Sequence, residues 1–204
     1  MNLKKIIDLI ENKEFEKGLI EVNKLLNIEE NVELFNLRGI ILNAQNKTNE
    51  ALEAFNEALK KDPKNIAVYK NLIAILINQN DDEKLIECYK KLIKIDKKNT
   101  SYYNNLAIIY DRNNKKEKAI KTINQAIMID NNSEISHINK GIILFNKDEK
   151  ETHKESKESL LKALELNQKN LNALFILGKI LYEVGEYDES IKYLDSHNTI
   201  HSKN

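Results

Sequence analysis

Few residues of this chain have the types and spacing that catalysis or metal binding requires. Cys88 stands beside Tyr89, and no histidine lies near it in the sequence to activate its thiol. His197 and His201 would share one face of a helix, as metal-binding pairs do, but no clear third ligand accompanies them. We therefore interpret Cys88 as a packing residue and expect no metal site.

Cofactor binding has equally little support. The chain holds only five glycines, and none of them forms a glycine-rich phosphate loop or a dinucleotide fingerprint. We expect no catalytic residue and no cofactor, so the chain is not predicted to be an enzyme.

Three asparagines are the most regular candidates for ligand binding. Asn71, Asn105 and Asn139 follow one another at a constant interval of 34 residues (71, 105, 139). Each carboxamide offers both a donor and an acceptor, so a ladder of them can pair with the backbone of an extended ligand. Asparagine is also abundant throughout this chain, and a purely structural role is the alternative.

The same interval organises the whole sequence. The stretch from Val32 to Asn65 can be laid in register on residues 66–99 and 100–133 without insertion or deletion. A fixed period of this length is typical of a stacked array of helical repeats. We divide the chain into six units forming a single solenoid over residues 1–204: 1–31, 32–65, 66–99, 100–133, 134–170 and 171–204.

Each unit is predicted to contain two amphipathic helices, because its apolar residues recur three and four apart in two runs separated by a polar break. Gly39 and Ala51 lack the bulk that would hold the two helices of one unit apart, and Ala58 does the same toward the next unit. Pro63 suits a helix stop.

This pattern resembles the tetratricopeptide repeat (TPR), through Phe35, Gly39, Leu42, Ala51, Phe55, Ala58 and Pro63. The resemblance implies an all-α, right-handed superhelical solenoid of antiparallel helix pairs. Ile73, Leu85 and Leu92 occupy the three places where the family prefers small residues. We predict wider helix spacing in residues 66–99, since a close-packed interface cannot absorb three branched side chains without moving.

Two stretches depart from the repeat. Residues 134–170 contain three extra residues, which we place in the charged break 147–154, as a solvated turn or as a binding protrusion. After residue 196 the apolar pattern of the last unit is lost. The degenerate last helix could cap the array, or a partner or a second copy could complete it by self-association.

The resemblance also identifies the face that lines the inner groove of such solenoids, where peptides or partner helices usually bind. Toward the carboxyl end this face collects apolar residues, which generally mark a contact surface. They are Ile135, Ile138, Ile142, Phe145, Phe175 and Tyr182. The alternative is that the terminal helix or a second copy covers them.

Some family members grip chaperone carboxyl termini through a two-carboxylate clamp. Here Lys70 matches the first place of the clamp, but Ala74 replaces a required asparagine, and Ile135 and Asn139 stand where basic residues belong. Clamp-type chaperone binding is therefore disfavoured.

Charge and cysteine content narrow the remaining function classes. Lysine and arginine (32) balance aspartate and glutamate (32), whereas nonspecific nucleic-acid binding usually leaves a basic excess. A single cysteine permits no internal disulfide, and the longest apolar run, 72–77, is too short for a membrane span. We expect a cytoplasmic protein with no nucleic-acid partner and no membrane contact.

These observations predict a non-catalytic protein-interaction module, an adaptor or scaffold, that binds a peptide segment or helix in its concave groove. The predicted contacts are Asn71, Asn105, Asn139, Ile138, Ile142, Phe145, Phe175 and Tyr182. The alternative is an accessory subunit or the repeat region of an enzyme. RNA binding comes third, because the groove places supply few cations, namely Lys70, Arg112 and Lys179.

Overall fold

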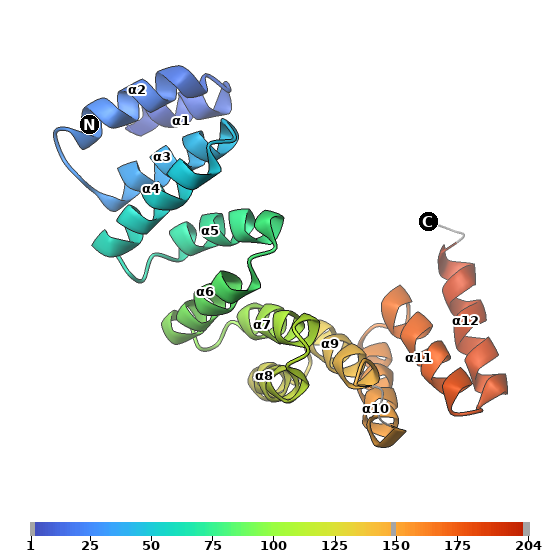
Figure 1. The fold of residues 1–204 in the computed structure, drawn as a ribbon. Coiled ribbons are helices and arrows are strands. Elements are labelled where there is room, and N and C mark those ends of the chain that lie inside the picture. Colours follow the sequence, from blue (N-terminus) through green and yellow to red (C-terminus); the bar gives the residue numbers. More distant parts are fainter. Residues whose placement is uncertain (1–2, 148–149, 202–204) are drawn as a thin grey trace. The chain divides into compact units, whose positions relative to one another are not determined.

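The computed structural model describes residues 3–147 and 150–201, and within these ranges it consists of twelve α-helices without a strand (Figure 1). The helices are α1 (Leu3–Glu11), α2 (Phe15–Leu26), α3 (Val32–Ala44), α4 (Thr48–Lys61), α5 (Ile66–Gln79), α6 (Asp82–Ile95), α7 (Thr100–Arg112), α8 (Lys116–Ile129), α9 (Glu134–Phe145), α10 (Lys150–Leu166), α11 (Leu171–Glu183) and α12 (Tyr187–His201).

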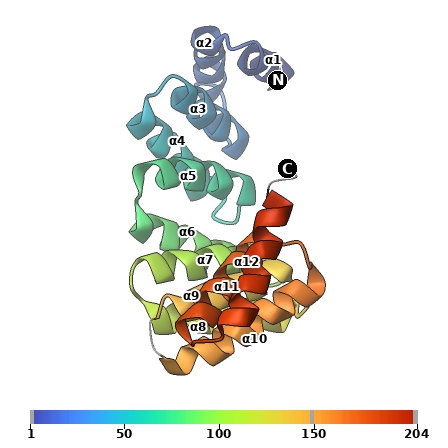
Figure 2. The same cartoon turned by 90° about the vertical axis from the view of Figure 1, so that its right-hand side faces the viewer.

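The helices fall into two compact parts, residues 1–95 with α1–α6 and residues 96–204 with α7–α12. Within each part, helices that follow one another in the chain pack as antiparallel pairs, and the pairs are stacked in chain order (Figures 1 and 2). The predicted all-α helical repeat solenoid is thus confirmed.

Asparagine side chains start and end many of these helices. Asn31 Oδ1 accepts a hydrogen bond from the Leu34 backbone N–H at 2.9 Å, which caps α3. The residues before α5, α7, α9 and α11 cap them in the same way; they are Asn65, Asn99, Ser133 and Asn170. Asn46, Asn80 and Asn114 end the turns after α3, α5 and α7 with φ of 61°, 54° and 56°, a left-handed conformation that asparagine tolerates.

Small residues allow the paired helices to touch, as the sequence predicts. A Cβ added to Gly39 of α3 would lie 2.5 Å from Phe55 Cε1 of α4, and one added to Gly141 of α9 would lie 2.5 Å from Leu160 Cγ of α10. Phe55 and Leu160 are themselves buried, so neither can move aside freely. Glycine is therefore required at the closest approach of these helices.

The pair α5/α6 is packed differently. Ile73, Leu85 and Leu92 are buried, at places where the neighbouring units have small residues. The backbones of α5 and α6 approach each other less closely than those of α3/α4, α7/α8, α9/α10 or α11/α12 (Figure 1). The predicted wider spacing is confirmed.

The three extra residues of the fifth unit lie within 147–154, as predicted, but they extend a helix instead of a turn. Helix α10 begins at Lys150 and has 17 residues, whereas α4, α6 and α8 have 14 each. Most of the expected break at 147–154 is thus helical, although residues 148–149 lie outside the described ranges. The insertion lengthens the start of a helix more than it lengthens a turn, because lysine and glutamate favour helix.

The carboxyl-terminal stretch remains helical where the repeat pattern is lost. Helix α12 continues through the residues where the repeat pattern is lost and ends at His201. Ile200 and Tyr193 of this helix pack against the core formed by α9, α10 and α11. The degenerate last helix therefore covers part of the end of the array, which was one of the two sequence-based alternatives.

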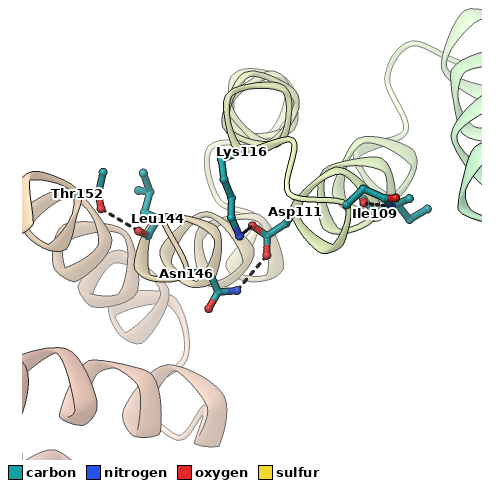
Figure 3. A network of polar contacts seen from close by, with 7 residues as sticks. Ile109, Asp111, Lys116, Leu144, Asn146 and Thr152 are labelled. Carbon is teal, nitrogen blue, oxygen red and sulfur yellow. Dashed lines mark hydrogen bonds and ion pairs between the residues drawn. The ribbon is translucent and has the colours of Figure 1, made fainter. Parts of the chain in front are cut away.

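A half-buried polar network joins consecutive pairs in the second part (Figure 3). Asp111, in the last turn of α7, accepts a hydrogen bond from Lys116 at 2.6 Å and another from Asn146 at 3.0 Å. Lys116 begins α8 and Asn146 follows α9, so one carboxylate holds three helix ends together. The side chains of Asp111 and Lys116 are only 12% and 17% exposed.

We expect Gly39→Ala to destabilise the protein, because the added methyl meets the buried Phe55 ring. The overpacking cost exceeds the gain in helix propensity, for a net loss of about 1–2 kcal/mol. Gly18→Ala is the matched comparison, since its methyl would lie 3.2 Å from Ile41 Cδ1 and 3.8 Å from Leu9 Cβ, so that its neighbours need to move by only a few tenths of an ångström. Urea denaturation followed by circular dichroism measures both; equal midpoints for the two variants would contradict the account.

We expect Asp111→Ala to lower the free energy of unfolding by about 1.5–3 kcal/mol, because two hydrogen bonds to a poorly exposed charge are lost. Glu14→Ala breaks an exposed pair with Lys17 and should leave the denaturation midpoint unchanged. If both variants shift the midpoint equally, the network in Figure 3 does not hold the helix ends together.

Candidate functional site

Two aromatic rings and a lysine connect the first helices of the last two units. Lys179 Nζ, on α11, lies 5.3 Å from the centroid of the Phe145 ring of α9 and 5.9 Å from that of Phe175, also on α11. Both distances suit a cation–π contact. The arrangement joins the inner faces of α9 and α11 into one surface, which we call the aromatic face (Phe145, Phe175, Lys179 and Tyr182).

The aromatic face is open to solvent in part. Phe175 is 43% exposed and Tyr182 is 63% exposed, whereas Phe145 and Ile142 are half-buried and pack against the core. Ile135, at the start of α9, is also exposed. Exposed aromatic side chains of this size are common where proteins contact partners.

Ile138 was predicted to lie on this open face, and that prediction is wrong. It is only 7% exposed and belongs to the core with Leu160, Ala173 and Leu174. Helical angles alone placed it on the inner face, but the packing of α11 against α9 buries this side of the helix.

The terminal helix covers one edge of the aromatic face. The His197 ring of α12 lies 5.5 Å from the Phe175 ring and 5.8 Å from the His201 ring, with which it stacks. The last helix therefore covers Phe175 in part, which agrees with the alternative that the terminal helix lies over the apolar residues. Tyr182 instead contacts Tyr187, with ring centroids 5.4 Å apart.

Two of the three regularly spaced asparagines bind other asparagines. Asn71 Nδ2 donates to Asn36 Oδ1 at 2.9 Å in the first part, and Asn139 Nδ2 donates to Asn104 Oδ1 at 3.1 Å in the second. Each bond joins first helices of neighbouring units, from α5 to α3 and from α9 to α7. Asparagine at this place of the repeat thus has a structural role.

Asn104 is the centre of a buried polar cluster that the sequence did not reveal. Its Nδ2 donates to the Thr100 carbonyl and to Ser136 Oγ, both at 3.0 Å, and Ser136 Oγ donates to Ser133 Oγ at 2.9 Å. The signal that could have identified it is the recurrence of Asn36 and Asn104 one place before the predicted ladder. Asn105, in contrast, has an exposed side chain.

Cys88 is a packing residue, as the sequence predicted, and His137 is buried as well. Cys88 is 5% exposed, and burial, together with the charges of Glu87 and Asp81, raises the pKa of its thiol to about 11. A thiol with such a pKa is a poor nucleophile near neutral pH. His137 is buried, and its Nε2 donates to the Asn131 carbonyl at 2.9 Å.

Neither a metal site nor a membrane span is found in the part of the chain that the structure describes. No three histidine, cysteine, aspartate or glutamate side chains converge there in a way that could hold a metal ion. None of the helices within residues 3–147 and 150–201 combines the length and apolar character that crossing a bilayer requires.

Comparisons with known proteins agree with this architecture. Models of the tetratricopeptide repeat match residues 42–106 and 100–133. No curated protein matches the chain significantly. Several solved structures share the fold at low sequence identity, which is evidence for the fold alone.

One of these structures is MamA. It is 20% identical to this chain, the match covers 81% of this chain and 95% of MamA, and the TM-score is 0.71. A second structure is YrrB, described as a TPR protein with an unusual peptide-binding site. It is 14% identical, the match covers 88% of this chain and 91% of YrrB, and the TM-score is 0.68. A third is a tetratricopeptide repeat protein from Parabacteroides merdae. It is 15% identical, the match covers 97% of this chain and 77% of that protein, and the TM-score is 0.73. The family matches, the repeat period and the shared fold together identify the chain as a tetratricopeptide repeat protein.

Proposed function

We propose that the chain is a non-catalytic protein-interaction module, and that it holds a peptide segment or a helix of a partner protein on the aromatic face. The observation that carries this proposal is the exposure of Phe175 and Tyr182 beside a lysine lodged between two aromatic rings. Aromatic side chains are enriched at the centres of protein interfaces.

The roles of the individual residues follow from their exposure. Phe175 and Tyr182 supply apolar contact area, and the half-buried Phe145 supports Phe175 through Lys179. Lys179 forms no ion pair within the described residues, so a carboxylate of the ligand can pair with it. Asn105 offers a donor and an acceptor to the ligand backbone. Asn139 uses one hydrogen of its amide group to bind Asn104 Oδ1 and can donate the other to the ligand.

A peptide ligand is also consistent with the comparisons, since YrrB is a TPR protein with a peptide-binding site. A chaperone carboxyl terminus is not the ligand that we propose, because Ala74, Ile135 and Asn139 replace residues that a carboxylate clamp needs.

The test is a comparison of Phe175→Asp/Tyr182→Asp with the unchanged protein in affinity purification from the native cell lysate, quantified by mass spectrometry. We expect a partner that the unchanged protein retains and the double variant loses by about tenfold or more, because two apolar anchors are replaced by charges. Phe145 is left unchanged because it packs against the core.

The matched control is Ile20→Asp/Ile77→Asp, which changes apolar side chains of similar exposure, 54% and 52%, on α2 and α5, outside the aromatic face. Circular dichroism must show equal helicity for both double variants. A partner that the Phe175/Tyr182 variant binds at full strength, or that both variants lose equally, would contradict binding at the aromatic face.

A further inference from the structure

A shallow hollow in the first unit repeats part of a cleft in the third. The hollow has a volume of about 240 Å³, and its described lining comes from α1 and α2, through Lys5, Leu9, Lys17, Ile20 and Glu21. The cleft, of about 360 Å³, lies between α4 and the wide pair α5/α6. One interval of 67 residues leads from each lining residue of the hollow to a lining residue of the cleft (5 to 72, 9 to 76, 17 to 84, 20 to 87 and 21 to 88). Hollow and cleft are therefore the same surface of two repeat units.

Inside the array, the second helix of the preceding unit covers this surface. Residues 52, 56 and 59 of α4 line the cleft opposite α5 and α6, and Leu52 and Leu59 pack against a core that includes residues of α5. The junction before it is built in the same way, since Leu19 and Leu26 of α2 pack against a core that includes residues of α3. The chain itself thus shows which kind of helix fits the surface.

Over the first unit this surface is open. Among the described helices, α1 and α2 lie close only to each other and to α3, which belongs to the following unit. Ile20 is 54% exposed, and Lys5 and Lys17 are exposed beside it. We call the lining of the hollow the amino-terminal face (Lys5, Leu9, Lys17, Ile20 and Glu21).

The matching half of such a junction lies on α12. An interval of 139 residues relates the last unit to the second, because Gly178 faces Leu194 as Gly39 faces Phe55 (39 to 178 and 55 to 194). The same interval leads from residues 52, 56 and 59 to the residues that we call the carboxyl-terminal face, Ile191, Asp195 and Asn198. All three are exposed, Ile191 to 58%, whereas Leu52 and Leu59 are half-buried.

We propose that copies of this chain associate head to tail, with the carboxyl-terminal face of one copy on the amino-terminal face of the next. Ile191 then takes the place of Leu52 and meets Ile20 of the neighbouring copy. A second copy is the occupant because both halves of the junction occur on this chain, in the register that its own units use. Such a contact is heterologous, so it forms a ring or an open chain of copies instead of a symmetric dimer.

The contact depends on shape and apolar area more than on charge. Lys5 already pairs with Glu21 at 3.1 Å, and Lys17 pairs with Glu14. Only Ile191 of the carboxyl-terminal face is apolar, so the contact buries less apolar area than α4 does on α5. We therefore expect an association that is weaker than an internal junction and depends on protein concentration.

Analytical ultracentrifugation of the unchanged protein, Ile20→Asp and Ile191→Asp tests the proposal. We expect the average mass of the unchanged protein to rise with concentration and each variant alone to stay monomeric, because each variant has lost one half of the contact. An equimolar mixture of the two variants should form a dimer and nothing larger. In that mixture one intact face of each kind remains, and the two altered faces stop further growth.

Ile77→Asp, on α5 with an exposure of 52%, changes neither face and should associate like the unchanged protein. An unchanged protein that is monomeric at every concentration, or a variant mixture that is, would overturn the proposal. A variant that dimerises alone would do the same, since the contact would then be symmetric.

Cross-linking gives a readout that does not need the charged substitutions. After Cys88→Ser, which removes the single cysteine, we expect a bismaleimide to link Ile20→Cys to Ile191→Cys several times faster than it links either variant to itself. Equal rates would contradict the head-to-tail contact.

Discussion

The volume of the side chain between the two helices of a pair is the constraint on which the rest of this structure depends. Where Gly39 faces Phe55, no space remains even for a methyl group, and α3 and α4 lie in close contact. Where Ile73 and Leu85 stand in place of a glycine and an alanine, α5 and α6 lie farther apart. One repeat length thus gives two kinds of helix pair, and the wider pair produces a cleft.

Asparagine provides a second regularity, which concerns backbone and amide hydrogen bonds. Helix starts leave N–H groups without partners, and Asn31, Asn65, Asn99 and Asn170 satisfy some of them. Asn46, Asn80 and Asn114 adopt the left-handed conformation that ends the turns between paired helices. The asparagine content of the chain is therefore explained in large part by its fold, without reference to a ligand.

The sequence was sufficient to predict the helix pairs and the wider third unit, because these follow from local periodicity and side-chain volume. It was not sufficient to place Ile138, whose burial depends on how α11 packs against α9. The amide pairs of Asn71 and Asn139 also escaped prediction, since their partners, Asn36 and Asn104, lie 35 residues away. The extra residues at the start of α10 could not be assigned to a turn or a helix from the sequence, because a charged stretch suits both.

The most direct test of the central claim is the distance between α5 and α6, measured by electron paramagnetic resonance with spin labels on the exposed residues 74 and 90 after Cys88→Ser. Ile73→Gly with Leu85→Ala gives this pair the residue types that Gly39 and Ala51 give to α3 and α4. The account predicts that the distance distribution shifts to shorter values in a protein that keeps its helicity. An unchanged distribution in a folded variant would show that side-chain volume does not set the spacing of the helices.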